Sequence, residues 1–361
     1  MIEILDPATD ATRIAALLDP GSGFSLTDAW DTAARELAAI DPTGPRGTPR
    51  YVVYDWRARI VKLPDSETFW RLRTARNRYL LDDQEQRRWS NARIGIAGLS
   101  VGASALSVCA LTGARRFRLA EHDTLGLTNL NRLPASVCDI GVPKLTIAQR
   151  RVFETDPYSS VTVFPDGYTP DIAPAFLGDA DEPLTVLIEE MDDLAAKVDI
   201  RRRARDAGIP VVMATDNGDN AILDVERFDL DPGYPLFHGR AGDLTDLTTS
   251  TLDDPRDRAA IAQRIVGADI TPRTRFSLTQ VGRSLPSWPQ LGTAATLAGA
   301  VAAYAARLIA TGHPLPSGRY RLDMDRALLG AAADTADQWN ELTEAQFLAA
   351  VSAMGGDPRS A

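Results

Sequence analysis

The stretch RIGIAGLSVGAS, Arg93–Ser104, decides the fold class of this 361-residue chain. It begins with a short apolar run that is typical of a buried strand, turns at Gly98 and Gly102, and continues into a helical pattern. Glycine lets a backbone turn sharply and approach a ligand, and the free N–H groups at the start of the helix attract phosphate. The stretch therefore predicts a nucleotide-binding turn, although a tight turn without a ligand has the same pattern.

Short apolar runs alternate with helical stretches in the sequence that follows. Strand patterns occur at 116–120, 161–165, 184–190 and 210–215. This alternation predicts an α/β fold, a Rossmann-like, doubly wound and mainly parallel sheet with helices on both faces. A long buried helix at Gln290–Ala310, a strand at 320–323 and a closing helix at Asp334–Met354 follow, while 229–286 is rich in loops.

Residues 1–90 have a different pattern, which predicts a small N-terminal α/β cap. Its expected elements are helices near 10–18 and Leu26–Ile40, a hairpin at Tyr51–Leu63, and one or two helices between Pro64 and Trp89. We therefore expect the cap at 1–90, a nucleotide-binding domain at 91–330 and a helical tail at 331–361.

The charge and the cysteine content of the chain disfavour several classes of function. The formal charge of −10 disfavours a general nucleic-acid or anionic-membrane binder, because no basic excess is present to neutralise phosphates. The two cysteines, Cys109 and Cys138, form no CxxC pair, so we expect no zinc site. The N-terminus lacks the basic start and apolar core of a signal peptide, and the apolar run 291–310 is rich in Ala, Gly and Thr. We expect a cytoplasmic protein without a membrane partner.

A second informative stretch is EHDTLGLTNLNRLP, 121–134. Glu121 ends a predicted strand, at the sheet edge where its carboxylate would accept hydrogen bonds from both ribose hydroxyls. Asn129 and Arg132 are three residues apart and share one face if the segment is helical. An arginine fork and an amide suit a polyphosphate, and Lys144, in DIGVPK, adds a compact positive charge.

The acidic counterpart is LIEEMDDLAAK, 187–197, where an apolar strand ends in four acids: Glu189, Glu190, Asp192 and Asp193. A carboxylate opposite phosphate-binding cations is what Mg²⁺ needs, because the ion is shared between protein and phosphate oxygens. A site that transfers a hydride does not need a carboxylate that binds Mg²⁺. Each acid taken singly is also typical of a solvated helix start.

Together these motifs resemble the adenylation domain of the ThiF/MoeB family, relatives of ubiquitin-activating enzymes. The resemblance covers roughly 76–312 and rests on the spacing of five residues, Glu121, Asn129, Arg132, Lys144 and Asp192. It implies that the protein binds ATP and Mg²⁺ and adenylates the C-terminal carboxylate of a ubiquitin-like protein, sulfur carrier or peptide, releasing pyrophosphate.

The same resemblance implies a role for each matched residue. The nucleotide loop would be Gly98, Ser100 and Gly102, with Glu121 on the ribose, Asn129, Arg132 and Lys144 on the phosphates and Asp192 on Mg²⁺. In this family, the neighbouring subunit also contributes an arginine to the active site. Arg78 is the candidate here, with Arg76 as the second choice, which implies a homodimer with two shared sites.

Several residues depart from the family pattern. Glu121 stands where Asp is usual, Ser100 replaces a glycine, and Asp192, Asp193 and Lys197 replace an Asp-Asn pair with a following Arg. The zinc cysteine pairs of many relatives are missing, as is any cysteine after Cys138, which disfavours a thioester step. These departures indicate a divergent branch.

Two other classes remain open. A nicotinamide-dependent oxidoreductase would use the glycine loop and Glu121, although the pattern GxGxxG is absent and Arg132, Lys144 and Asp192 would have no role. A non-catalytic scaffold could keep the fold without turnover. Within the enzyme class, the activated carboxylate belongs to a carrier protein, a ribosomal peptide or a modified RNA base, and the acidic composition disfavours the RNA.

Overall fold

The computed structural model describes most of the chain: residues 2–179, 181–242, 261, 264–267, 270–281, 283–285, 287–334, 342–343, 345–347 and 349–350. The chain forms two compact units. The first comprises 1–91 with 110–115 and 150–160, and the second comprises 92–109, 116–149 and 161–361. Most of the helix expected at Asp334–Met354 lies outside the described residues, as does 243–260 of the loop-rich segment.

The first unit is built on a four-stranded sheet with the order β1-β3-β4-β2. Its elements are β1 (Ile2–Leu5), α1 (Ala11–Leu18), β2 (Ser25–Asp28), α2 (Trp30–Ile40), β3 (Pro49–Tyr54), β4 (Arg59–Pro64), α3 (Ser66–Arg73) and α4 (Asp83–Asn91). The strands β3 and β4 pair antiparallel. The hairpin predicted at Tyr51–Leu63 is therefore confirmed.

The helix predicted at Leu26–Ile40 is wrong over its first four residues, because α2 begins at Trp30. Ser25–Asp28 form the exposed strand β2, which pairs in parallel with β4. The side chains of Thr27 and Asp28 bond to Arg59 and Lys62 across this pair. Asp28 also accepts a hydrogen bond from the main-chain N–H of Trp30, where α2 begins. The tertiary pairing thus overrides a local helical pattern.

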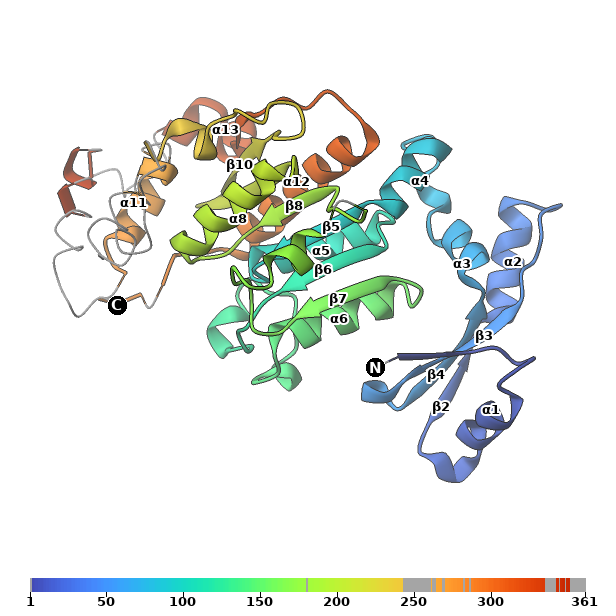
Figure 1. Cartoon of the computed structure of the whole chain (residues 1–361). Coiled ribbons are helices and arrows are strands. Elements are labelled where there is room, and N and C mark those ends of the chain that lie inside the picture. Colours follow the sequence, from blue (N-terminus) through green and yellow to red (C-terminus); the bar gives the residue numbers. More distant parts are fainter. Residues whose placement is uncertain are drawn as a thin grey trace. The chain divides into compact units, whose positions relative to one another are not determined.

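The second unit is built on a seven-stranded sheet with the order β11-β10-β9-β8-β5-β6-β7 (Figure 1). Its strands are β5 (Arg93–Ala97), β6 (Arg116–Ala120), β7 (Ser160–Phe164), β8 (Val186–Glu189), β9 (Val211–Asn217), β10 (Asn220–Glu226) and β11 (Gly318–Leu322). β5 pairs in parallel with both β6 and β8, and β8 pairs in parallel with β9. The chain order reverses beside β5, so the predicted doubly wound sheet is confirmed.

Helices cover both faces of this sheet. The helices of this unit are α5 (Val101–Leu111), α6 (Lys144–Thr155), α7 (Ala173–Leu177), α8 (Leu194–Asp206), α11 (Pro272–Leu278), α12 (Gly292–Thr311) and α13 (Met324–Leu329). Ile96 lies against α5 at Gly102, whereas Ala97 belongs to the hydrophobic cluster that includes Val198 of α8. Successive side chains of a strand point to opposite faces, so α5 and α8 cover opposite sides.

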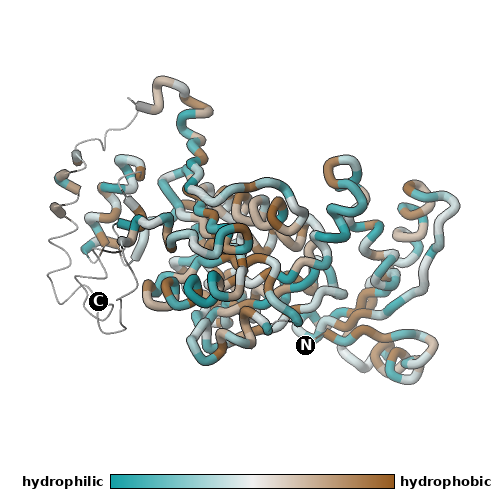
Figure 2. Tube along the Cα trace, turned by 45° about the horizontal axis from the view of Figure 1, so that its top comes forward, coloured by the Kyte–Doolittle hydropathy of each residue, from teal (hydrophilic) through white to brown (hydrophobic). Residues whose placement is uncertain are grey.

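The helix α12 packs on β8, β9 and β10. Among the described residues it is the helix that is long and apolar enough to cross a membrane, but half of that segment is buried inside the protein. At Gly299 its backbone lies against Ser104 and Ala105 of α5, where a methyl group would overlap them. It has the position of a core helix. Figure 2 shows hydrophobic stretches through the middle of this unit, with hydrophilic ones on the turns around it.

The strand β10 was not predicted. It pairs antiparallel with β9 across a tight turn at Gly218, which adopts a positive φ of 71°. Asn-Gly between two apolar runs is a strong hairpin signal. The same signal is present here as Asn217-Gly218, shortly after the predicted strand at 210–215.

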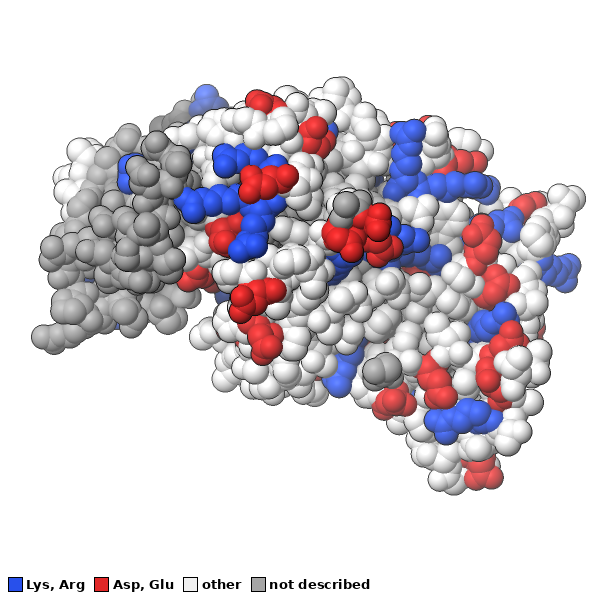
Figure 3. All heavy atoms as spheres, viewed as in Figure 1, with Lys and Arg blue, Asp and Glu red and all other residues white. Residues whose placement is uncertain are grey.

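On the face drawn in Figure 3, acidic and basic side chains are interspersed, and no broad basic patch is visible among the described residues.

Candidate active site

The glycine loop and the residues that the sequence singles out after β6 and β8 lie at one edge of the second unit's sheet. β5, β6, β8 and β9 are parallel, so their carboxyl ends share this edge. The glycine loop follows β5, the segment 121–134 follows β6, and the acidic segment follows β8. In open α/β sheets, ligands bind outside these ends, at the point where the chain order reverses.

The packing of the fold requires glycine at both positions of the loop after β5. Gly98 has a φ of 88°, and a Cβ there would overlap the main-chain carbonyl of Glu190. At Gly102, a Cβ would lie 2.9 Å from the side chain of Ile96. Gly98 therefore allows the loop to lie tightly against the segment after β8, and Gly102 allows the start of α5 to lie against β5.

Glu121 lies at the end of β6, as predicted, and is 8% exposed. One carboxylate oxygen accepts a 2.8 Å hydrogen bond from the N–H of Leu99 in the glycine loop. The other accepts hydrogen bonds from the N–H groups of His122 and Asp123. Glu121 thus ties two loops of the edge together, and its binding to a ribose stays a prediction.

Arg132 reaches the glycine loop from the segment after β6. Its Nε donates a 3.0 Å hydrogen bond to Oγ of Ser100, and a terminal nitrogen donates to the carbonyl of Thr128. Burial lowers the pKa of Arg132, and the carboxylates of Asp216 and Asp192 partly offset this effect. Two acids from β9 and the segment after β8 therefore lie within electrostatic reach of the guanidinium.

Asn129 and Lys144 have local partners as well. Asn129 ends a short 3₁₀ turn, Leu127–Asn129, and its side-chain oxygen accepts a 2.8 Å hydrogen bond from Gly126 N–H. Lys144, only 8% exposed, begins α6 and forms a 2.7 Å ion pair with Asp123. This pair lowers the pKa of Asp123, which the sequence did not single out.

The four acids after β8 have separate roles. Asp193 caps α8 by accepting a hydrogen bond from Ala196 N–H, and Glu190 accepts one from Ala214 N–H. Burial raises the pKa of Glu190. Asp192 is exposed, and among the described residues no group donates a hydrogen bond to its carboxylate. Of the four, Asp192 has the carboxylate that fits a cation.

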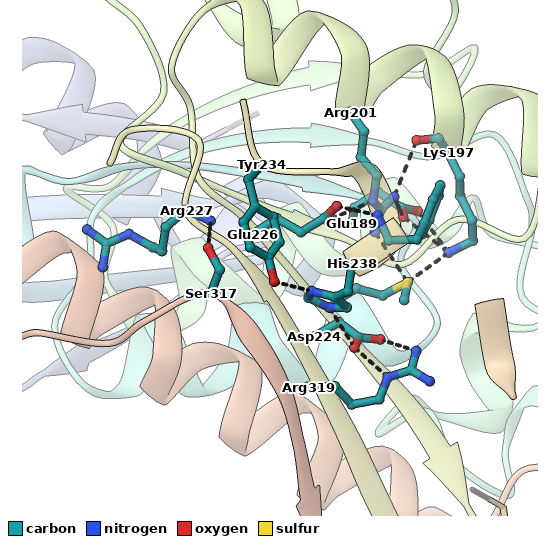
Figure 4. A network of polar contacts seen from close by, with 12 residues as sticks. Glu189, Lys197, Arg201, Asp224, Glu226, Arg227, Tyr234, His238, Ser317 and Arg319 are labelled. Atoms are coloured by element: carbon teal, nitrogen blue, oxygen red, sulfur yellow. Dashed lines mark hydrogen bonds and ion pairs between the residues drawn. The ribbon is translucent and has the colours of Figure 1, made fainter. Parts of the chain in front are cut away.

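Glu189 belongs to a buried charge network instead (Figure 4). Its carboxylate accepts hydrogen bonds from Arg201 and from Lys197, the latter at 3.1 Å. Arg201 also donates to Glu226 of β10 at 2.7 Å, and both Arg201 and Glu189 have no exposed surface. Lys197, which stands in the family's arginine position, therefore pairs with Glu189.

The acids Glu121 and Asp123, with His122 between them, offer ligand atoms that lie within 4.8 Å of one another. The carboxylate of Glu121 already accepts three main-chain N–H groups, and His122 and Asp123 are exposed. This spacing alone does not make a metal site.

Arg78 and Arg76 are exposed residues of the first unit. Cys109 is buried in α5, where burial raises the pKa of its thiol, as expected of core packing. Cys138 is exposed.

The sequence missed Gln290. Its side-chain nitrogen donates a 2.9 Å hydrogen bond to Asp216 of β9, and its carbonyl accepts one from Asn131. It joins the start of α12 to the edge site across 74 residues of sequence, and no local pattern could have predicted this pairing.

Residues 74–221 match the model of the ThiF family. This part of the chain is a ThiF family domain. The match covers the glycine loop, the segment after β6, Lys144 and Asp192, which are the residues on which the resemblance rests.

Two curated relatives contain parts similar to this chain. An uncharacterised protein of Mycobacterium tuberculosis, MT1398, is 38% identical over 312 residues, which is 82% of this chain and 42% of that protein. A tRNA threonylcarbamoyladenosine dehydratase of Bacillus subtilis is 24% identical over 166 residues, 44% of this chain and 64% of that enzyme. The chain thus spans less than two thirds of each relative.

Among solved structures, that of PaaA is similar to this chain with a TM-score of 0.50 and 19% identity, over 71% of this chain and 77% of PaaA. This likeness shows the fold of the ThiF domain.

Proposed function

We propose that the ThiF domain catalyses the ATP-dependent adenylation of a carboxylate at the C-terminus of a small carrier protein or peptide. The contact between Arg132 and Ser100 carries this proposal. It holds a guanidinium over the glycine loop, at the sheet edge that also carries Lys144 and Asp192.

The proposed reaction transfers an adenylyl group. The acceptor carboxylate attacks the α-phosphorus of ATP, the bond to the bridging oxygen breaks, and pyrophosphate leaves as the acyl-adenylate forms. A general base is not needed, because the carboxylate is already ionised at neutral pH. Arg132 and Lys144 hold the phosphates and offset their charge, so the domain acts by positioning and electrostatics.

Mg²⁺ fits this arrangement at Asp192, whose exposed carboxylate has no hydrogen-bond partner among the described residues and lies within electrostatic reach of Arg132. Bound there, it would neutralise charge on the triphosphate. Zinc has no role in the proposal, and neither cysteine is needed.

A homodimer completes the proposed site, with Arg78 of each subunit acting on the partner's nucleotide. The exposure of Arg78 is compatible with that role. We further propose a cytoplasmic location.

A carrier protein or peptide is favoured over RNA as the acceptor. The chain carries a formal charge of −10, and the face in Figure 3 shows mixed charges rather than a basic stripe. The name of the Bacillus subtilis relative refers to a tRNA nucleoside, so an RNA acceptor is the alternative that competition with tRNA would reveal.

A scaffold without turnover is the second candidate. The ionic groups of the edge partly satisfy each other: Lys144 pairs with Asp123, and Glu121 accepts three main-chain N–H groups. A protein that has lost the catalytic activity of its ancestors would keep such contacts after it no longer binds the ligand.

Calorimetric titration with ATP and MgCl₂ tests the proposal. The wild type should bind ATP in a magnesium-dependent manner, and Arg132→Ala should lose most of this affinity, whereas Arg13→Ala should not. Arg13 pairs with Glu3 on the surface of the first unit and serves as the matched control. Absence of binding at millimolar ATP would favour the scaffold.

A further inference from the structure

Asp216 has a buried carboxylate oxygen that has no hydrogen-bond partner among the residues that the structure describes. The residue lies near the end of β9 and is 3% exposed. Its Oδ2 accepts the hydrogen bond from Gln290 Nε2, whereas no described residue bonds to Oδ1. Buried carboxylate oxygens almost always have a donor, because leaving one unpaired is unfavourable. The described part of the fold thus holds an acceptor atom in place without supplying its donor.

This oxygen belongs to the edge that carries the proposed adenylation site. β9 is the neighbour of β8, after which Asp192 follows, and Asp216 lies within electrostatic reach of Arg132. Gln290 is fixed in turn, because its carbonyl accepts a 2.7 Å hydrogen bond from Asn131, the residue before Arg132. Asp216 and Gln290 therefore form one connected group with the segment that carries Asn131 and Arg132.

The position along the sheet distinguishes this group from the ribose side. The strand order places β6, with Glu121, on one side of the glycine loop, and β8 and β9 on the other. If the nucleoside lies toward Glu121, the β9 side is left for the acceptor. If the acceptor carboxylate binds beside Asp216, the two carboxylates would repel each other unless the acceptor also brings a hydrogen-bond donor.

A C-terminal residue brings such a donor. Its main-chain N–H and its carboxylate are attached to the same Cα, whereas in an aspartate or glutamate side chain the carboxylate is further from the main-chain N–H. Burial raises the pKa of Asp216 to about 6, which Gln290 and Arg132 only partly offset. A donated N–H would stabilise the ionised form.

We propose that Asp216 and Gln290 form the acceptor subsite of the domain, in which Asp216 Oδ1 accepts the main-chain N–H of the acceptor's C-terminal residue. This inference rests on the proposed function and names the two residues that would recognise the main-chain N–H of its C-terminal acceptor. The side chains that surround the C-terminal residue are not part of the proposal.

Three stable adenosine sulfamates serve as probes, because a sulfamate replaces the reactive phosphate of an acyl-adenylate. One carries N-acetylglycine, one carries acetoxyacetate, in which an ester oxygen replaces the N–H, and one carries no acyl group. Calorimetry with full-length protein at pH 7.5 gives the three affinities. The variants are Asp216→Asn and, as the matched control on the same hairpin, Asp219→Asn, because Asp219 bonds to Thr293 instead.

The wild type and Asp219→Asn should bind the N-acetylglycine probe about tenfold more tightly than the acetoxyacetate probe, as expected for one hydrogen bond to a charged group. In Asp216→Asn this preference should disappear. The new amide must present its oxygen to Gln290 Nε2, so its NH₂ group replaces Oδ1 and faces the N–H of the probe. Binding of the probe without an acyl group should be the same in all three proteins.

Two results would overturn the inference alone: equal affinity of the wild type for both acyl probes, or a preference that Asp216→Asn retains. In either case the probe without an acyl group still binds, and the proposed nucleotide site stands. If none of the probes nor ATP binds, the adenylation site itself is wrong, and the acceptor subsite is wrong with it.

Discussion

Arg132 Nε donates a 3.0 Å hydrogen bond to Ser100 Oγ, which joins the loop after β6 to the loop after β5. Ser100 stands where the family resemblance expects a glycine. The hydroxyl is therefore more than a tolerated departure, because it fixes a guanidinium beside the glycine loop. Preorganised donors of this kind lose little conformational freedom when a phosphate binds.

Ser100→Ala should weaken ATP binding roughly three- to tenfold, because the freed Arg132 must be ordered again when the nucleotide binds. The fold should be unaffected. Ser107→Ala is the matched control, since Ser107 lies further along α5 and bonds to the carbonyl of Ala103. Calorimetry measures both affinities. Equal affinities for the two variants would show that the Ser100 contact has no part in binding.

The position of Arg132 at this edge was predictable, but its contact with Ser100 was not. Alternating apolar runs predict parallel strands, and parallel strands bring their carboxyl ends to one edge, so Glu121 and Asp192 could be assigned to it from the sequence. The pairing of Asp216 with Gln290 could not, because 74 residues separate them and neither belongs to a repeating pattern. Side-chain pairs of this kind depend on the packing of α12.

Predictions from local sequence patterns were wrong or incomplete where contacts between distant segments determine the structure. Leu26–Asp28 suit a helix by residue spacing, yet they extend the first sheet beside β4. For Glu189 and Glu190 the sequence shows two adjacent acids, but only packing assigns Glu189 to Arg201. The missed strand β10 is different, since Asn217-Gly218 contained the hairpin signal.

Arg201→Met should destabilise the protein by about 3–5 kcal/mol, because Glu189 and Glu226 would be left as buried carboxylates without their shared guanidinium. Chemical denaturation measures this loss. Arg13→Met, which removes an exposed ion pair, should cost less than about 1 kcal/mol. A loss at Arg201 as small as that at Arg13 would mean that the network relaxes or admits water.

The stability of the protein should depend on the titration of Asp216. Its pKa is raised to about 6 in the folded state, so the folded protein binds this proton more tightly than the unfolded chain. The resulting stabilisation is fully present below pH 4 and is lost as the pH rises through 6. Relative to the wild type, Asp216→Asn should gain up to about 3 kcal/mol between pH 4 and pH 7, because its amide does not ionise.

Denaturation of the two proteins without ligand, at several pH values between 4 and 7, measures this difference. Asp219→Asn again serves as the control and should show no such trend. A constant difference between Asp216→Asn and the wild type across the range would mean that Asp216 does not titrate there.

Arg78 and Asp192 should complement each other between subunits. Arg78→Ala and Asp192→Ala should each abolish ATP–pyrophosphate exchange, which requires an acceptor that co-purifies with the protein. If Arg78 acts on the partner's nucleotide, a mixed dimer has one site with both residues intact. Random mixing of equal amounts makes about half of the dimers mixed, so about a quarter of the wild-type activity should return.

Subunit exchange must be complete for this test, and gel filtration of differently tagged subunits measures it. Mixing Arg78→Ala with Arg132→Ala should also restore activity, because Arg132 belongs to the same subunit as Asp192. Mixing Asp192→Ala with Arg132→Ala should not, since both changes fall in one subunit's nucleotide site and every mixed dimer then has two damaged sites. Failure of the first two mixtures despite full exchange would place Arg78 outside the shared site and leave Arg76 as the remaining candidate.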